Sequence, residues 1–477
     1  MRFNAKARGR ICGRTVVVAQ LLLALASCRS DRAGDADETG EPAAVALVGG
    51  TLLDPGSPAP REGVIVIRDG RLACVGTADE CPPPAGARSV DLRGLFVGPG
   101  LIDAHVHYGQ TGWVDGRPDA IDLRAQYPYD SVARALEAHP EPFHRAYLCS
   151  GITSVFDVGG FPWSYDIARA TRGSGDAPRV VAVGPLLATI TIDSQLMRQF
   201  NYMSDDSAVR AAVRAHKAAG AEGLKVWYIG VPDSLRPGMK ARLLAAGDEA
   251  RKQGLRLAVH ATELPAAKEA LEAGADVLVH NVEVGTLDSA FLSLARRNGT
   301  VLVPTLTVLE GYADVFLGRS PALRYPVECV DPATRKKLET VLSGKVPAEA
   351  RAFWQGTGFA QVRATSAANL LIAYKAGIPI AVGTDAGNPG TAHGPGIYRE
   401  MEAMQAAGMP ARAVFASATV VAARAMGLER ELGSLAAGKR ADLVVFGADP
   451  TSDIRNARQV RFVVRNGKLH SRSDLVF

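Results

Sequence analysis

Two histidines separated by a single residue, His105 and His107, stand at the end of an apolar stretch of the sequence. Alternate side chains of a β-strand project from the same face, so these two imidazoles are expected to point the same way. Paired imidazoles at the end of a strand suit a metal ion better than a hydrophobic core, although His-x-His alone is a weak signal. The pair raises the question of whether the chain supplies further ligands.

Four more ionisable residues end or interrupt apolar runs elsewhere in the chain: Lys225, His260, His280 and Asp385. Each has an ordinary alternative on its own. A histidine at a strand end is more often hydrogen-bonded in the core, and an aspartate before Ala-Gly more often caps a turn or helix. A chance meeting of six such residues at one place is far less expected than a metal site.

Lys225 lies between Leu224 and Val226, which are predicted to face a layer of helices, so its side chain is predicted to face the interior. Burial disfavours an ammonium group and shifts the pKa of a lysine downward. An internal salt bridge is the alternative. A neutral amine can also take up CO2, and the resulting carbamate can bridge two cations as a carboxylate does.

The charges of such a site favour two metal ions. Two divalent ions bring four positive charges, and a carbamate, the Asp385 carboxylate and a hydroxide remove three. The remaining positive charge would stabilise an oxyanion and lower the pKa of bound water.

Eight apolar segments are predicted to be strands, each followed by helical or loop sequence. They are Phe96–His107, Ile152–Val158, Val180–Gly184, Leu224–Tyr228, Leu255–His260, Val277–His280, Thr300–Thr305 and Ile378–Asp385. Helical runs that end at glycine precede several of them, which is typical of βαβ units. The sequence therefore predicts an α/β protein with a (β/α)8 TIM barrel, whose catalytic groups lie at the carboxyl ends of the strands. The long connections Tyr108–Leu148 and Leu306–Gly358 would open on that rim as walls or lids of a pocket.

Both ends of the chain have the texture of a β-sheet, with hairpin signals at Asp69-Gly70 and Asn466-Gly467. Each end is too small to fold alone, so we expect one small composite β-sandwich domain. Its predicted boundaries are residues 44–95 and 433–477, with the barrel over residues 96–432.

Residues 1–28 have the pattern of an export signal, a basic segment followed by a short apolar one. The signal ends in Leu25-Ala26-Ser27-Cys28, which resembles a bacterial lipobox, so Cys28 is a candidate for lipidation. An ordinary secretory signal with a chance cysteine is the alternative. Residues 29–43 are polar and acidic and are predicted to be a flexible tether. We expect an exported protein anchored to a bacterial membrane, on the periplasmic or cell-surface side.

The charge balance and the spacing of the cysteines bear on which partners and which cysteine sites the chain is expected to have. Residues 1–27 hold five of the 54 basic residues and no acidic one, so 49 basic residues face 49 acidic ones in the remainder. This balance gives no support for a nucleic-acid partner, which would require a basic face. Cys74 and Cys81 are a candidate disulfide in an exported protein, and no Cys-x-x-Cys pair suggests a structural zinc site or a redox motif.

The ligand set as a whole resembles the metal-dependent amidohydrolase superfamily. Three strings are similar to its imidazolonepropionase-like branch, which includes prolidase-type dipeptidases with a carboxylated lysine. They are Gly98-Pro-Gly-Leu-Ile-Asp-Ala-His-Val-His107, Val382-Gly-Thr-Asp-Ala-Gly387 and the segment Gly433–Val445. The resemblance spans about Val45 to His470. Val279-His280-Asn281 departs from the Glu-His-Gly common in that branch, and Thr262-Glu263 departs from the small residues that often follow the strand-five histidine.

The resemblance implies two divalent metal ions, preferably zinc, and hydrolysis of an amide or other C–N bond of a small molecule or dipeptide. His105, His107 and Asp385 would hold the more buried ion, His260 and His280 the second, and carboxylated Lys225 would bridge them. A hydroxide between the metals would attack the carbonyl, and Asp385 would pass its proton to the leaving nitrogen.

Two further residues are candidates from their positions alone. Tyr228 could donate a hydrogen bond to the oxyanion, or it could be a packed rim tyrosine. His393 could contact substrate, or it could be a loop histidine.

Other activities remain open at this point. A cyclic amide or lactone hydrolase, or a deaminase, could use the same ligands, although deaminases of this superfamily usually lack the bridging lysine. A lipid-anchored binding protein without activity would be expected to have lost ligands, and this chain keeps all six. The sequence does not indicate an oligomeric state.

Overall fold

The computed structural model describes residues 44–191, 199–321, 325–342, 346 and 348–477. The predicted export signal, the candidate lipidation residue Cys28 and the predicted tether lie outside these residues. Within them, no helix is both long enough and apolar enough to cross a membrane.

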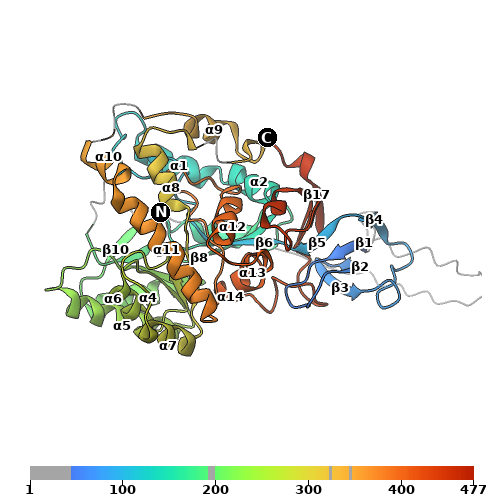
Figure 1. Cartoon of the computed structure of the whole chain (residues 1–477), viewed down its shortest axis with the longest axis horizontal. Coiled ribbons are helices and arrows are strands. Elements are labelled where there is room, and N and C mark those ends of the chain that lie inside the picture. Colours follow the sequence, from blue (N-terminus) through green and yellow to red (C-terminus); the bar gives the residue numbers. More distant parts are fainter. Residues whose placement is uncertain (1–43, 192–198, 322–324, 343–345, 347) are drawn as a thin grey trace, which may run out of the picture.

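Parallel strands form two sheets in the centre of the larger part of the molecule (Figure 1). One sheet has the order β6-β7-β8 and the other has the order β10-β9-β11-β12-β13-β14. Their bounds are β6 Leu101–Val106, β7 Ile152–Asp157, β8 Arg179–Ala182, β9 Leu186–Ala188, β10 Phe200–Tyr202, β11 Gly223–Trp227, β12 Arg256–His260, β13 Val277–Val279 and β14 Val301–Val303. Most of these strands are short runs of β-branched and aliphatic residues buried on both faces, the pattern expected of parallel strands covered by helices.

Backbone hydrogen bonds connect the two sheets on both sides. On one side, the segment 378–386 lies between β14 and β6: the amide of Ala381 donates to Leu302, and the amide of Ala104 donates to Val382, both at 2.9 Å. On the other side, the amide of Glu222 donates to Ala182 of β8 at 3.1 Å. Parallel neighbours therefore follow one another in a hydrogen-bonded circuit.

The predicted first strand, Phe96–His107, is two strands. Its first part, β5 (Phe96–Pro99), belongs to a different sheet, which strands from both ends of the described chain form. There β5 pairs with β15 (Leu443–Phe446) and β1 (Val45–Leu52). The chain changes sheet at Gly100, where a Cβ atom would lie only 2.1 Å from Oγ1 of Thr153. A side chain has no room at this position, so glycine permits the close approach to β7.

The predicted eighth strand, Ile378–Asp385, is not a continuous strand. Only isolated bridges occur, from Ile380 to Leu302 and from Ala386 to Val106. Pro379 has no amide hydrogen to donate, and Asp385 has a φ of 60°, so the segment cannot pair regularly along its length. The short strands β9 and β10 were not predicted either.

Helices flank the parallel strands, and most lie between successive strands along the chain (Figure 1). Gly220 ends α4 in the left-handed conformation at φ 99°, as the sequence predicts, and the Asp205 side chain caps the amino end of the same helix. The helices are α1 Tyr129–Ala138, α2 Glu141–Cys149, α3 Ser164–Thr171, α4 Asp206–Ala219, α5 Arg236–Gln253, α6 Leu264–Glu272, α7 Ser289–Asn298, α8 Val308–Phe316, α9 Pro332–Leu338, α10 Ala348–Gln355, α11 Thr357–Lys375, α12 Gly396–Ala406, α13 Ala411–Ser417 and α14 Val420–Ala425.

Strands from both ends of the described chain form one small sheet at one end of the molecule (Figure 1). Its order is β17-β16-β15-β5-β1-β2-β3, and β4 pairs with β1. The bounds not yet given are β2 Arg61–Arg68, β3 Arg71–Gly76, β4 Arg88–Asp91, β16 Val460–Arg465 and β17 Lys468–Ser471. In this domain, which the sequence analysis expected as a composite β-sandwich, hydrogen bonds join all eight strands into one sheet that branches at β1.

Two disulfides are present among the described residues. Cys74 and Cys81 are bonded within the small sheet region, with Cα atoms 5.7 Å apart. Cys149 and Cys329 are also bonded, and this bridge ties the end of α2 to a segment 180 residues later in the chain. The second bridge was not predicted, because nothing local in the sequence pairs two cysteines at that distance.

Arg465 fastens the small sheet to the larger part of the molecule. Its guanidinium is fully buried and donates to the carbonyls of Ala177 and Thr171, both at 3.0 Å. It also pairs with the buried carboxylate of Asp442 at 3.2 Å. Removing one member of such a buried pair leaves an uncompensated charge.

We predict that Arg465→Met lowers the free energy of unfolding by about 3–5 kcal/mol, because it strands the Asp442 carboxylate in the interior. Urea unfolding followed by circular dichroism measures the change. The matched control is Arg455→Met, whose exposed pair with Asp453 is expected to contribute less than about 1 kcal/mol. Equal losses in the two variants would contradict the role of Arg465.

Candidate metal centre

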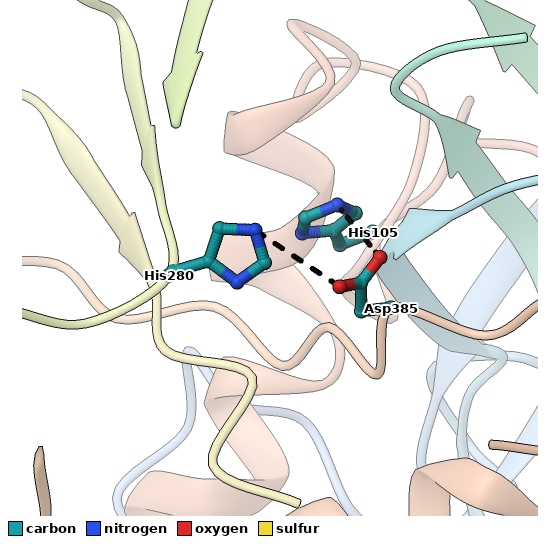
Figure 2. Close-up of side chains that lie close together, drawn as sticks. All are labelled: His105, His280 and Asp385. Carbon is teal, nitrogen blue, oxygen red and sulfur yellow. Dashed lines mark ion pairs between the residues drawn. The ribbon is translucent and has the colours of Figure 1, made fainter. Parts of the chain in front are cut away.

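His105, His107 and Asp385 meet where β6 and the segment 378–386 lie side by side. Nε2 of His105 lies 3.2 Å and Nε2 of His107 lies 3.0 Å from the same carboxylate oxygen, Oδ1 of Asp385. His280, directly after β13, brings its Nε2 to 4.0 Å from Oδ2 of Asp385. Figure 2 shows the side chains of His105, His280 and Asp385 converging from three separate segments. The ligand atoms of these three residues lie within 4.8 Å of one another.

His260 and Lys225 complete the predicted set from the neighbouring strands. His260 ends β12, and its ring centroid lies 4.2 Å from that of His280. Lys225 lies in β11 and is almost fully buried, and its charge interacts with Asp385, His105 and His260. The structure therefore brings the five predicted histidine and aspartate ligands together, with the buried Lys225 within electrostatic range of them.

The backbone is strained at this point. Five described non-glycine residues have a positive φ, and two of them, Asp69 and Asn466, lie in hairpin turns. The other three are His280, Thr305 and Asp385, with φ values of 67°, 46° and 60°. Such conformations cost energy and persist only where the surroundings impose them, which is typical of functional sites.

The hydrogen bonds of the histidines leave particular nitrogens facing the centre. Nδ1 of His107 is held by the carbonyl of Gly159 at 2.6 Å, and Nδ1 of His280 is held by Oγ1 of Thr305 at 2.7 Å. Among the described residues, neither ring nitrogen of His105 has a hydrogen-bond partner, although both are buried, and Oδ1 of Asp385 also has none. Buried polar atoms without partners are costly, and a cation among them would satisfy them. The donor set therefore fits divalent metal ions.

Burial sets the ionisation states that such a site needs. It lowers the pKa values of His105 and His260 well below the ordinary range and that of His280 to about 4, so the imidazoles are neutral and can bind a metal. Burial alone would raise the pKa of Asp385, but His105 and His107 outweigh it and hold that pKa well below its ordinary value. Burial also lowers the pKa of Lys225 to about 8 against the opposing effect of Asp385.

Asp157 is a buried acidic residue beside the centre that the sequence analysis missed. It ends β7, its Oδ1 accepts the amide of Gly159, and its Oδ2 has no hydrogen-bond partner among the described residues. Burial raises its pKa to about 7, against the opposing effect of His107. Its position near the end of the predicted strand Ile152–Val158 is the feature of the sequence that could have identified Asp157 as a candidate.

Tyr228 and His393 are both hydrogen-bonded to residues outside the predicted ligand set. The hydroxyl of Tyr228 donates to Oε2 of Glu269 on α6 at 2.7 Å. Nδ1 of His393 lies 2.6 Å from the hydroxyl of Tyr147 and its Nε2 lies 2.9 Å from the carbonyl of Gln110, so both ring nitrogens are occupied. The structure thus favours the packing alternatives that the sequence left open for both residues.

The two long connections pack against each other beside the centre. Their apolar cluster contains Trp113 and Val114 from the first connection and Val315 and Phe316 from α8 in the second. We call this the cap cluster. It buries side chains that the sequence analysis assigned to walls or lids of a pocket.

Arg117 and Tyr312, one from each long connection, both donate to Oδ1 of Asn388, at 2.8 Å in the case of Tyr312. The side-chain nitrogen of Asn388, Nδ2, in turn donates to the backbone carbonyl of Asp385 at 3.1 Å. These three residues also escaped the sequence analysis, because the contacts of Asn388 with Arg117 and Tyr312 join positions far apart in the chain and no local pattern marks them.

The chain is similar to known proteins over most of its length. The Amidohydrolase family model matches residues 96–470. An imidazolonepropionase from Caulobacter vibrioides is 27% identical over 430 residues, which cover 82% of this chain and 89% of that protein. A 5-methylthioadenosine/S-adenosylhomocysteine deaminase from Symbiobacterium thermophilum is 25% identical over 419 residues, which cover 84% of this chain and 85% of that protein. The crystal structure of a Xaa-Pro dipeptidase with bound methionine in the active site has a TM-score of 0.68 at 25% identity and covers 90% of this chain and 100% of that one.

We predict that Lys225 takes up CO2 faster as the pH rises towards 8, because its pKa is lowered to about 8. The neutral amine reacts, so at fixed dissolved CO2 the initial rate should rise about tenfold per pH unit below 8 and level off above it. Metal-free protein mixed with zinc and 13C-labelled CO2 would show this as growth of a carbamate signal in 13C NMR. The Lys225→Met variant should give no such signal, and an equal signal in both proteins would exclude Lys225 as its source.

Proposed function

Because the chain belongs to the amidohydrolase family, in which metal-dependent hydrolysis of C–N bonds is the common activity, we propose that it cleaves an amide bond of a small molecule or dipeptide at a binuclear centre. The observation that carries this proposal is the convergence of His105, His280 and Asp385 around buried nitrogen and oxygen atoms that lack hydrogen-bond partners among the described residues.

The proposal includes the architecture that positions the centre. We infer that the circuit of parallel strands is a (β/α)8 TIM barrel carrying the composite β domain at one end. Supporting this, the proposed ligands of β6 and β12 lie at or just after the carboxyl ends of those strands, where barrel enzymes place their catalytic groups.

The ligands divide into two groups by their contacts. His105, His107 and Asp385 would hold one ion, since the two Nε2 atoms share Oδ1 of Asp385. His260 and His280, whose rings adjoin, would hold the second, with Lys225 as its carbamate between the two. Neutral imidazoles with carboxylates favour zinc. Bound in this way, zinc would supply a Lewis acid for the scissile carbonyl and a water of lowered pKa.

The residues of the chain supply the proton transfer. Asp385 is ionised, and its Oδ1 faces His105 and His107, which leaves Oδ2 as the oxygen nearer the second histidine group. Oδ2 would accept a proton from the attacking water and deliver it to the leaving nitrogen. The positive φ of Asp385 and the hydrogen bond from Asn388 to its carbonyl fix the carboxylate for this task.

We predict that zinc-loaded protein hydrolyses members of a panel of dipeptides, N-acyl amino acids and cyclic ureides, and that chelation abolishes the activity. His105→Ala and Asp385→Asn should each lower kcat/KM at least about 100-fold and reduce zinc bound per chain, because losing even a residue that only hydrogen-bonds to a metal ligand lowers metal affinity or activity about 10–100-fold. Activity is followed by chromatography of the products, and zinc by mass spectrometry.

The matched control for these variants is His139→Ala, since this histidine is exposed at the end of α1 and touches none of the proposed ligands. It should keep full activity and zinc content. Full activity in His105→Ala and Asp385→Asn would overturn the proposed centre, and release of ammonia from an aminopurine, with no cleavage of the panel, would favour a deaminase.

We further propose that the protein is exported and anchored to a bacterial membrane through a lipid on Cys28. The lipobox-like ending of the signal supports this address. Cys74–Cys81 and Cys149–Cys329 support export as well, because disulfides persist in oxidising compartments and are rare in the cytosol.

We predict that expression of the full chain in a bacterium with a labelled fatty acid places label and protein together in the membrane fraction. The Cys28→Ser variant should lose the label and its membrane retention. Cys12→Ser, which alters a cysteine inside the predicted signal, should keep both. Retention of label in Cys28→Ser would contradict the anchor.

A further inference from the structure

A groove of about 590 Å3 lies between α8, α11 and α12, which are neighbours in Figure 1, and the segments that follow β13 and β14. Its volume is within the range of small-molecule sites. None of the six proposed metal ligands lines it. The groove is therefore separate from the metal centre.

Apolar and mostly small side chains form part of the wall of the groove. Ala360, Ala364 and Ala367 share one face of α11, since they are spaced by four and three residues. Leucines and further alanines add to this part of the wall: Leu306, Leu309, Ala403, Ala406 and Ala407. Alanine methyl groups are too short to fill the space between the helices, so an apolar slot is left open.

A cationic pair lies in the lining of the same groove. Arg363 and Arg399 both donate to the carboxylate of Glu310, so two guanidinium groups share one acid. Glu402 also lines the groove, but it pairs with Arg458 at 2.6 Å. These groups leave one positive charge in excess.

Glu283, the remaining acid of the lining, reduces this excess by about half a charge near neutral pH, because burial raises its pKa to about 7. The slot thus combines apolar side chains with two guanidinium groups that share one carboxylate.

One residue, Thr305, connects the lining of the groove to a proposed metal ligand. This residue lines the groove, is 3% exposed, and holds Nδ1 of His280 with its hydroxyl at 2.7 Å. The next two residues are fixed by Glu400, whose carboxylate accepts the amides of Leu306 and Thr307 at 2.7 and 2.9 Å. A molecule in the groove would press on the turn that orients His280.

We propose that this groove is a second binding site, for an aliphatic carboxylate, whose chain lies along the alanine walls and whose carboxylate pairs with Arg363 and Arg399. Occupancy is transmitted through Thr305 to His280. This second part rests on the proposed function, because it requires His280 to be a metal ligand.

Calorimetric titration of the metal-free, full-length mature protein with octanoate tests the site independently of catalysis. Octanoate should bind at least about tenfold more tightly than octan-1-ol or octylamine, because the charged pair recognises the carboxylate. Arg399→Met removes the excess charge and should weaken octanoate binding at least about tenfold, whereas Glu310→Gln increases the excess and should strengthen it. Ala364→Trp fills the slot and should abolish binding.

The matched control is Arg169→Met, an exposed arginine on α3 that pairs only locally with Asp166. It should bind octanoate as the wild-type protein does. Binding of the alcohol as tight as that of octanoate, or unchanged binding in both Arg399→Met and Ala364→Trp, would overturn the proposal.

Zinc titrations with and without octanoate test the link to His280. Octanoate should change the zinc dissociation constant of the wild-type protein and leave that of Ala364→Trp unchanged, and zinc should change octanoate binding by the same factor. Octanoate binding without any change in zinc affinity would overturn the coupling. Absence of peptide hydrolysis alongside both effects would count against the proposed function alone.

Discussion

The cost of burying ionisable groups is the constraint on which the metal centre depends. Removal from water keeps the imidazoles of His105 and His260 neutral and lowers the pKa of Lys225 to about 8. Asp385 stays ionised in the same surroundings because it faces several ring nitrogens at once. One buried carboxylate among neutral imidazoles is a donor set that a divalent cation would complete, so the burial of these groups fits a metal site.

Two further buried carboxyl groups hold this arrangement in place. Asp103 accepts the amide and the hydroxyl of Thr384 and the amide of His105, which fastens β6 to the irregular segment next to Asp385. Glu400 does the same for the turn that carries Thr305 and, through it, His280. Burial raises the pKa of each to about 7, so these supports are themselves costly. Both buried carboxyl groups lie where their hydrogen bonds fix the backbone beside a proposed ligand.

Local patterns in the sequence predicted what depends on local physics. Buried β-branched runs predicted most of the parallel strands, and a titratable residue within or at the end of such a run identified each proposed ligand, because parallel strands deliver their carboxyl ends to one rim. The segment 378–386 was predicted as a strand from its apolar run, but Pro379 lacks an amide hydrogen and Asp385 has a positive φ, so the segment pairs only through isolated bridges. The Cys149–Cys329 bridge and the contacts of Tyr228 and His393 likewise depend on partners far away in the chain, which no periodicity reveals.

The two long connections link access to the centre with the orientation of Asp385. The cap cluster joins them, Lys337 pairs with the buried Asp115 at 2.7 Å, and the Cys149–Cys329 bridge ties the second connection to α2. Both connections also meet on Asn388, which holds the backbone of Asp385. The segments that pack beside the proposed ligands are thus tied by hydrogen bonds to the backbone of Asp385.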